Sequence, residues 1–258
     1  MHTPVQIILL TDDPYVSPHL FSDHRKLCPD LWKREVVAGH WLPLKDPELT
    51  ARYITEFVTY MEGGPESLGL HRAHRLGKAD PDNYIDGKQV LVTGAGSGIG
   101  RSAALKFAAE GADLILADIN FDAARATAEE VRALGRRALV QQVDVADVEA
   151  LEHLADWAES EAGPVDIVCN NAGIGMAGGF LETTRAAWDR IIKINLWSVI
   201  DGSKIFAERM VRDRRPGFIV NTASAAGFTP LRIYPAYATT KAAVLMLSEC
   251  QRADLADQ

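Results

Sequence analysis

The sequence predicts an α/β protein whose larger part is a Rossmann-type, doubly wound parallel sheet. From Gly87 onward, short apolar runs alternate with longer stretches of helical apolar spacing, and a glycine-rich turn follows the first run. Strands that alternate with helices in this way form a parallel sheet with helices on both faces. Residues 1–62 follow a different pattern, so we expect a smaller unit before this sheet.

The elements of the larger part are predicted from the period of their apolar residues. Buried strands are short apolar runs, whereas a helix that covers a sheet repeats its apolar residues every three to four positions. The expected strands are Gln89–Thr93, Asp113–Ala117, Ala138–Val143, Val165–Cys169 and Phe218–Asn221. The expected helices are Ile99–Glu110, Phe121–Leu134, Val148–Ser160, about Arg185–Arg212 and about Ala236–Ala256.

The smaller unit, residues 1–62, contains two strand patterns and the helical stretches that follow them. The strand patterns are Pro4–Leu10 and Lys33–Val37, and the later helical stretch is about Pro47–Met61. This unit is too short to enclose a large core of its own.

Residues 63–86 are predicted to be a linker between this unit and a domain over residues 87–258. The segment begins with Gly-Gly-Pro-Glu-Ser and continues with polar and turn residues that have little apolar periodicity. Its histidines, His71 and His74, are expected to be exposed to solvent and without a functional role.

The composition excludes some classes of partner. The chain has 258 residues, 47% of them hydrophobic, and a net charge of −8. Nucleic acid is therefore not expected as a partner, because binding phosphates requires a basic face. One basic cluster is present, and we interpret it as the solvated end of a helix; it consists of Arg212, Arg214 and Arg215.

The sequence also predicts a cytoplasmic protein without metal. No run reaches the roughly 18 apolar residues of a membrane span, and the start lacks the basic region of a signal peptide. The cysteines are odd in number, widely spaced and unlike a metal-binding pattern, which fits a reducing compartment; they are Cys28, Cys169 and Cys250.

A glycine-rich turn, Thr93-Gly94-Ala95-Gly96-Ser97-Gly98-Ile99-Gly100, joins the first strand to the first helix. Glycines allow a tight turn and a close approach to a pyrophosphate, and the helix N-terminus supplies free N–H groups. The spacing through Gly94, Gly98 and Gly100 is G-x3-G-x-G. A tight connection without a ligand is the alternative interpretation, but the position between strand and helix favours a dinucleotide site.

Acidic residues follow the second and third strands. Asp118 can bind the hydroxyls of the adenosine ribose and would repel a 2′-phosphate, which favours NAD over NADP. The alternative is that Asp118 caps the turn into Asn120. After the third strand, Asp144 is suited to the edge of the adenine and Val145 to its ring face.

Tyr237 and Lys241 form a Y-x3-K pair at the start of a predicted helix. Their i, i+4 spacing places both side chains on one face. A free tyrosine is a poor base at neutral pH, and a neighbouring ammonium stabilises the phenolate. Ser224 lies just after the fifth strand, where a hydroxyl can hold a substrate oxygen. Each of these features alone is weak evidence, because such residues often occur by chance.

Together these motifs resemble those of the classical short-chain dehydrogenase/reductase family. The resemblance extends from Gly87 to the end of the chain, with five motifs in the family's order and separation. They are Thr93-Gly94-x3-Gly98-x-Gly100, Asn170-Asn171-Ala172-Gly173, Asn195 in Ile194-Asn195-Leu196, Ser224 in Ala223-Ser224-Ala225-Ala226-Gly227, and Tyr237-Ala-Thr-Thr-Lys241.

The resemblance implies a mechanism in which NAD exchanges hydride with an alcohol or carbonyl. Tyr237 would transfer the substrate proton, and Ser224 would orient the reacting oxygen. Lys241 would bind the nicotinamide ribose and lower the pKa of the tyrosine, and Asn195 would hold a water that connects the relay to solvent. The resemblance also implies further cofactor contacts, at Ser97, Ile99, Asn171, Ala172 and Gly173.

The resemblance also implies features that the residues up to Gln258 do not contain. Family members continue with two more strands, a Pro-Gly segment beside the nicotinamide and a substrate loop. We therefore expect a sheet that is incomplete at its C-terminal edge. Family members commonly pair through two helices, which correspond here to Arg185–Arg212 and Ala236–Ala256. The parent protein, meaning the longer protein to which we expect this sequence to belong, is therefore expected to be a homodimer or homotetramer.

Residues 1–62 resemble the C-terminal end of an α/β-hydrolase of the epoxide-hydrolase type. The resembling residues are Thr11-Asp12-Asp13-Pro14 and Gly39-His40-Trp41, in which Asp13 matches the triad acid and His40 the general base. The alternative interpretation is that Asp13 is an aspartate of a turn and His40 a histidine with a structural role only. No G-x-S-x-G nucleophile motif occurs in the chain, so this piece is not expected to hydrolyse a substrate alone.

The leading hypothesis is therefore an NAD-dependent oxidoreductase domain that acts on a secondary alcohol or carbonyl, within a fused hydrolase–dehydrogenase protein. The alternative is a fragment that binds NAD without turnover. The complete set of Ser224, Tyr237, Lys241 and Asn195 favours an enzyme, whereas the expected incompleteness of the domain favours the alternative.

Overall fold

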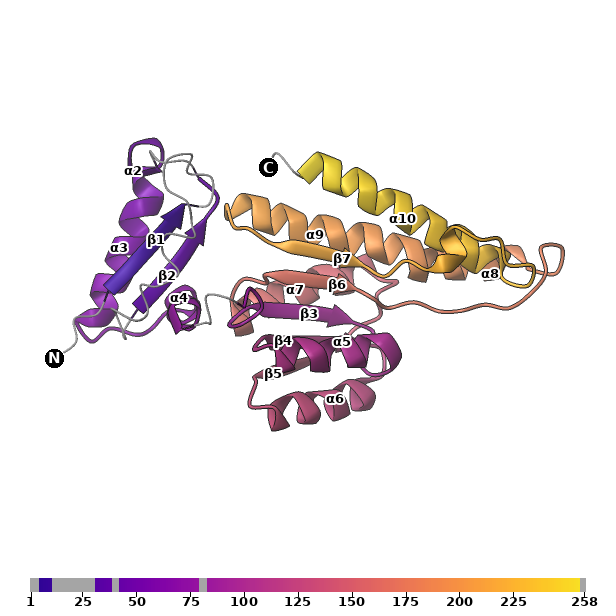
Figure 1. The fold of residues 1–258 in the computed structure, drawn as a ribbon, viewed down its shortest axis with the longest axis horizontal. Helices are drawn as coiled ribbons and strands as arrows, with labels where there is room; N and C mark the ends of the chain where they lie inside the picture. Colours follow the sequence, from indigo (N-terminus) through magenta and orange to yellow (C-terminus); the bar gives the residue numbers. More distant parts are fainter. Residues whose placement is uncertain (1–4, 11–30, 39–41, 79–82, 256–258) are drawn as a thin grey trace.

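The computed structural model describes residues 5–10, 31–38, 42–78 and 83–255. Within these ranges the strands form two sheets, one of two strands in the order β1-β2 and one of five in the order β5-β4-β3-β6-β7. The smaller sheet, with its helices, lies beside the larger part (Figure 1). The positions predicted for a hydrolase triad, Asp13 and His40, lie outside the described residues.

Every neighbouring pair of strands in the larger sheet is parallel. The strands are β3 (Gln89–Thr93), β4 (Asp113–Asp118), β5 (Ala138–Gln142), β6 (Ile167–Asn170) and β7 (Phe218–Asn221). The chain adds β4 and β5 on one side of β3, and then β6 and β7 on the other. Such a reversal leaves a crevice at the carboxyl ends of the two strands beside it, where open α/β sheets bind ligands.

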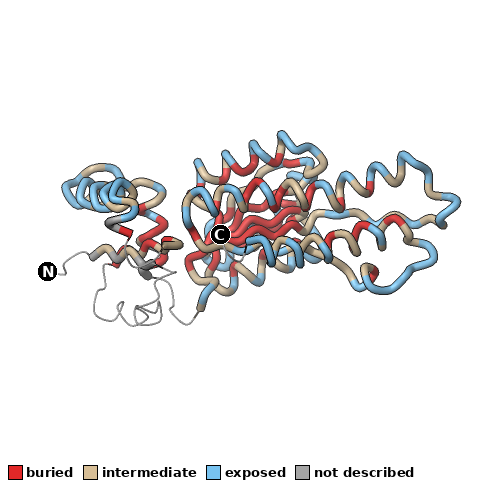
Figure 2. The backbone as a smooth tube through the Cα atoms, turned by 90° about the horizontal axis from the view of Figure 1, so that it is seen from above, coloured by how far each residue is buried: buried red, intermediate tan, exposed pale blue. Residues whose placement is uncertain are grey.

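Helices cover both faces of the larger sheet, as the sequence predicted. They are α5 (Gly98–Ala109), α6 (Phe121–Ala133), α7 (Val148–Ala162), α8 (Arg185–Ile192), α9 (Ser198–Arg212) and α10 (Pro235–Leu255). Because side chains alternate along a strand, Val90 and Val92 pack in one core with α5 and α6, whereas Leu91 packs in another with α7 and α9. The buried residues are concentrated in this sheet (Figure 2).

One predicted helix is divided in the structure. The sequence predicted a single helix over about Arg185–Arg212, but a π-helical turn, Lys193–Trp197, lies between α8 and α9. The turn contains Asn195, which is fully buried. Apolar periodicity does not reveal such a turn, because it adds one residue without ending the helix.

The N-terminal unit is built around the parallel pair β1 (Val5–Leu10) and β2 (Leu31–Val36). Among the described residues, two helices precede the predicted linker, α2 (Leu42–Lys45) and α3 (Pro47–Met61). Asp46 is the N-cap residue of α3, and its side chain accepts a hydrogen bond from the Leu49 backbone N–H at 3.0 Å.

The segment predicted to be a linker contains a helix, α4 (Leu68–Lys78). It packs against β2, and its Leu70 and Ala73 are buried beside Trp32. His74 stacks on Trp32 with ring centroids 4.2 Å apart, so the expectation that it is exposed was wrong. The domain boundaries stay a prediction, but part of residues 63–86 is folded onto the N-terminal unit.

Charged side chains join this unit to the larger domain at the amino ends of its strands. Arg72 of α4 pairs with Asp166, and Glu35 of β2 contacts Lys88 at 2.9 Å. Arg214, on the loop between α9 and β7, pairs with Asp46, which precedes α3, at 2.8 Å.

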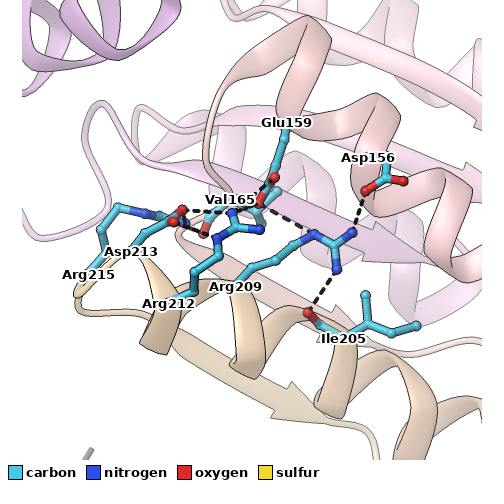
Figure 3. A network of polar contacts seen from close by, with 8 residues as sticks. All are labelled: Asp156, Glu159, Val165, Ile205, Arg209, Arg212, Asp213 and Arg215. Carbon is cyan, nitrogen blue, oxygen red and sulfur yellow. Dashed lines mark hydrogen bonds and ion pairs between the residues drawn. The ribbon is translucent and has the colours of Figure 1, made fainter.

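The basic cluster after α9 is only in part a solvated helix end. Arg212 is exposed and pairs with Glu159 and Asp213, in agreement with that interpretation. Arg215 is buried instead, donates to the Val165 carbonyl at 3.3 Å and lies 3.5 Å from Asp213 (Figure 3). The sequence interpretation was therefore wrong for Arg215. In the described part of the chain, no helix combines the length and hydropathy that crossing a membrane requires.

Candidate active site

The glycine-rich turn forms the floor of a cavity of about 670 Å³ at the carboxyl ends of β3 and β4. Gly94 and Gly98 have positive φ angles of 66° and 53°, which favour glycine. A Cβ on Gly94 would lie 2.9 Å from the Ala172 Cα, and one on Gly100 would lie 2.1 Å from the Gly94 carbonyl oxygen. The turn therefore requires glycines, whether or not a ligand is bound.

The N-terminus of α5 opens onto this cavity. Ser97 caps the helix without a side-chain hydrogen bond to it and is exposed, so its hydroxyl and the first backbone N–H groups of the helix are accessible. Free N–H groups and the helix dipole at this position favour a negatively charged group.

Asp118 stands at the end of β4 and lines the same cavity. One carboxylate oxygen accepts a hydrogen bond from the Gly96 backbone N–H at 2.8 Å, and the other accepts from the Asn120 N–H at 2.9 Å. The carboxylate therefore braces the glycine turn and also caps the next turn. Asp144 similarly accepts from the Ala146 N–H at 2.9 Å while lining the cavity.

The segment after β6 is tied to the end of β3 by Thr93. The Thr93 hydroxyl accepts from the backbone N–H groups of Asn171 at 3.0 Å and Ala172 at 3.1 Å. The Asn171 side chain returns a hydrogen bond to the Thr93 carbonyl at 3.0 Å. These bonds hold the Asn171–Gly173 wall of the cavity beside the glycine turn.

Lys241 projects from α10 into the same region. Its side chain is buried, and Nζ donates to the Thr222 carbonyl at 2.6 Å. Nζ also lies 5.8 Å from the ring centroid of Tyr237, one helical turn earlier. Burial lowers the pKa of Lys241 from its usual value, because desolvation disfavours the ammonium.

The Asn195 side chain is hydrogen-bonded to protein partners through both its oxygen and its nitrogen. Its Oδ1 accepts from the Ile174 backbone N–H at 2.8 Å, and its Nδ2 donates to the Ile174 carbonyl at 2.9 Å. Nδ2 also approaches the Thr240 hydroxyl at 3.3 Å. The side chain thereby fixes the loop after Gly173 against α10.

Ser224 begins the 3₁₀ turn Ala225–Gly227, and its hydroxyl accepts from the Ala226 backbone N–H at 3.1 Å. The turn packs closely on α10, since a Cβ on Gly227 would lie 3.0 Å from the Lys241 carbonyl oxygen. Ser224 is partly buried and is not among the residues that line the cavity.

The structure gathers most of the predicted site residues around one cavity. Those that line it are Gly94, Ser97, Gly98, Ile99, Asp118, Asp144, Val145, Asn171, Ala172, Gly173, Tyr237 and Lys241. Gly100, Asn195 and Ser224 are not among the residues that line it.

Several other residues that line the cavity were not predicted from the sequence. They include Ile119, Ile174, Arg190, Ile194, Thr222, Leu231 and Tyr234. Thr222 directly follows β7, and the ends of parallel strands meet at one edge, which is a signal that could have identified it. Arg190 and Leu231 come from segments that only the tertiary structure brings to the cavity.

A family model described as short chain dehydrogenase matches residues 88–258. The chain belongs to this family of oxidoreductases. Its agreement with the family covers the whole five-stranded sheet and the cavity at its carboxyl edge.

Curated and solved relatives agree with this assignment. "Probable oxidoreductase EphD" of Mycobacterium tuberculosis is 42% identical over 252 residues, which cover 98% of this chain but 42% of that protein. The match therefore includes the N-terminal unit, and this chain spans less than half of that relative. A short-chain dehydrogenase from Burkholderia phymatum, solved in complex with NAD, is 36% identical with a TM-score of 0.65; the match covers 67% of this chain and 62% of that one.

A second solved relative contains both a cofactor and a ketone. It is 7α-hydroxysteroid dehydrogenase complexed with NADH and 7-oxo glycochenodeoxycholic acid, 36% identical with a TM-score of 0.65, and the match covers 68% of this chain and 69% of that one.

Proposed function

We propose that the protein is an NAD(H)-dependent oxidoreductase that interconverts a secondary alcohol and a carbonyl compound. The observation that carries the proposal is the single cavity that joins the glycine turn and Asp118 to Tyr237 and Lys241. A dinucleotide bound along the glycine turn would place its reactive end among the catalytic candidates. The solved relatives with NAD and NADH support this cofactor.

The residues present fit such a cofactor. The first turn of α5 offers its N–H groups to a pyrophosphate, and Gly98 leaves open space where a Cβ would otherwise project. Asp118 supplies a negative charge at the end of β4, where it would accept from ribose hydroxyls and repel a 2′-phosphate. Asp144 and Val145 line the part of the cavity that we assign to the adenine.

The bound nicotinamide would supply the hydride chemistry, and the protein would position the substrate and transfer a proton. Tyr237 would exchange the proton of the substrate hydroxyl through its phenolic oxygen. The ammonium of Lys241, held by the Thr222 carbonyl, would stabilise the phenolate. Ser224 would hold the substrate oxygen if its hydroxyl turned from the Ala226 N–H toward the cavity.

Asn195 is proposed as a positioning residue. Its side chain holds Ile174 in place beside the cavity, so it would fix the wall against which substrate and nicotinamide bind. Three further points stay predictions. They are a water relay at Asn195, a homodimer or homotetramer of the complete protein, and its cytoplasmic location.

We also propose that residues 1–62 are the end of an α/β-hydrolase fused to the dehydrogenase. Support comes from the parallel pair β1–β2 and from the relative whose match extends through both parts. An epoxide hydrolase would produce a vicinal diol, which a dehydrogenase could oxidise. The alternative, a fragment that binds NAD without turnover, predicts cofactor binding and no reaction.

The deciding experiment offers NAD⁺ and a panel of secondary alcohols and vicinal diols to the full-length protein, and follows NADH by absorbance. The Tyr237→Phe variant should retain NADH binding, measured by fluorescence, and lose at least about 99% of the rate, because general acid–base catalysis contributes about a hundredfold or more. Tyr234→Phe is the matched control, because Tyr234 lines the same cavity three residues away. Binding without turnover in the wild type would favour the alternative, and an active Tyr237→Phe variant would contradict the assigned proton donor.

A further inference from the structure

A second cavity, of about 710 Å³, lies where the N-terminal unit meets the dehydrogenase domain. The N-terminal side is formed by β2, α3 and α4, and the other side by Pro164 before β6 and Arg215 after α9. The cofactor cavity is at the carboxyl ends of the strands, so this one lies toward the opposite, amino end of β6. The proposed oxidoreductase mechanism makes no use of it.

Positive charge exceeds negative charge in the lining of this junction cavity. Its charged members are Arg34, Arg52, Arg72, Arg215, Glu35, Glu56 and Asp213. Glu35 already contacts two ammonium groups, those of Lys33 and Lys88, each at 2.9 Å. Arg52, which is exposed on α3, has no carboxylate partner among the described residues. The lining therefore retains positive charge that a bound anion would balance.

Two of these arginines are buried and have donors without acceptors. Arg72 and Arg215 are 7% and 9% exposed, and among the described residues the Nε–H of each has no hydrogen-bond partner. Arg72 binds Asp166 through Nη2. Arg215 binds the Val165 carbonyl through Nη1 and lies beside Asp213 through Nη2 (Figure 3 shows the contacts of Arg215). A buried charged donor without an acceptor is costly, and the described part of the protein does not fully satisfy these two guanidinium groups.

The arginines also act on one another. Burial lowers the pKa of Arg215, and the positive charge of Arg72 lowers it further. Burial lowers the pKa of Arg34 as well; Glu56 opposes the shift, and Arg72 again contributes to it. Guanidinium groups from β2, α4 and the loop after α9 therefore converge closely enough to repel each other, which an intervening anion would relieve.

We propose that the junction cavity binds the phosphate group of a small phosphate ester. Guanidinium forks match phosphate oxygens, and a phosphate has more acceptor oxygens than a carboxylate, so it can accept from several arginines at once. The cavity exceeds the size of a phosphate ion, and Tyr53, Ala51 and Ala73 line it and can contact the organic part. The Cζ atoms of Arg34 and Arg52 lie 4.5 Å and 5.5 Å from the Tyr53 ring centroid, so both guanidinium groups are within cation–π distance of this ring.

Calorimetric titration of the full-length protein tests the proposal, at fixed ionic strength and with saturating NADH so that the cofactor cavity is filled. Inorganic phosphate should bind saturably, phenyl phosphate more tightly, and benzoate at least about tenfold more weakly than phenyl phosphate, because benzoate has fewer acceptor oxygens. Absence of saturable phosphate binding would overturn the proposal. Equal binding of benzoate would show a carboxylate site and would overturn the assigned ligand class.

Two variants and a matched control locate the binding. Arg52→Gln removes an exposed charge at the rim and should weaken phenyl phosphate binding about threefold, and Arg215→Gln should weaken it at least about tenfold. Arg125→Gln, which removes an exposed arginine of α6, should leave it unchanged. Circular dichroism checks whether Arg215→Gln folds. Because Arg52 is exposed, the result for Arg52→Gln does not depend on the folding of the Arg215 variant. Unchanged affinity in Arg52→Gln, or an equal loss in Arg125→Gln, would overturn the location.

Discussion

Arg72 and Asp166 form a buried ion pair although 94 positions separate them in the chain. Arg72 lies on α4 of the N-terminal unit, and Asp166 directly precedes β6 of the dehydrogenase sheet. The second carboxylate oxygen of Asp166 accepts a hydrogen bond from the Gln89 backbone N–H at 2.8 Å. A single carboxylate therefore connects α4 to the amino ends of β3 and β6, and the two parts of the chain are joined through it.

The first prediction is that Asp166→Asn destabilises the protein by about 3 kcal/mol, because it leaves the guanidinium of Arg72 buried without its counter-charge. The free energy of unfolding in urea measures the effect. Asp156→Asn is the control, since Asp156 is exposed and its pair with Arg209 is expected to contribute less than about 1 kcal/mol.

The double variant Arg72→Met/Asp166→Asn should recover part of the lost stability, because no unpaired charge remains buried. If Asp166→Asn and Asp156→Asn reduced the free energy of unfolding equally, the Arg72–Asp166 pair would stabilise the protein no more than an exposed ion pair.

The second prediction concerns acid. Burial raises the pKa of Glu35, but the ammonium groups of Lys88 and Lys33 outweigh it and lower the pKa to about 2. A carboxylate with a lowered folded-state pKa stabilises the protein above its unfolded-state pKa and loses this contribution as pH falls through the folded value. The contribution is roughly 3 kcal/mol at neutral pH and should decline below about pH 4.5, toward pH 2.

Urea unfolding at a series of pH values tests this in the wild type, in Glu35→Gln and in the exposed control Glu149→Gln. Glu35→Gln should be less stable at neutral pH and lose less stability on acidification, whereas the control should follow the wild type. Parallel curves for all three proteins would contradict the assigned role of Glu35.

Local patterns predicted the larger sheet and many of the residues that line the cavity at its carboxyl edge. Gly94 and Gly98 adopt conformations that glycine alone favours, and Asp118 ends a strand whose apolar run is visible in the sequence. Such features depend on a few neighbouring residues, so their pattern survives in the sequence.

The features that the sequence did not predict depend on distant partners. Helix α4 resembled a linker because a buried position is occupied by Arg72, whose partner Asp166 is remote in the chain. Arg215 resembled a solvated residue for the same reason, since burial beside Val165 and Asp213 follows only from the fold. The hydrogen bonds between the Asn195 side chain and the Ile174 backbone likewise join residues that are 21 positions apart.

The third prediction is that Asp118→Asn narrows the preference for NAD(H) over NADP(H) in the full-length protein. The amide retains most of the size and one acceptor oxygen, so it can still accept from the Gly96 N–H, while the charge that would face a 2′-phosphate is lost. The ratio of kcat/KM for the two cofactors measures the preference, and a change of about tenfold corresponds to about 1.4 kcal/mol. Asp144→Asn is the control, because Asp144 lines the cavity after a different strand. A wild-type preference for NADP(H) would contradict the role assigned to Asp118.

The fourth prediction is that a polypeptide of residues 1–258, expressed alone, self-associates through β7. In the described part of the chain β7 pairs only with β6, and it ends the order of the sheet. Phe218 and Val220 are 53% and 47% exposed on this edge strand, and exposed apolar edges pair with other chains. Val220→Lys should therefore shift the polypeptide toward smaller species in size-exclusion chromatography with light scattering. Val211→Lys changes an exposed valine of α9 instead and should have no such effect. A monodisperse wild type, or the same response in both variants, would show that the edge of β7 does not drive association.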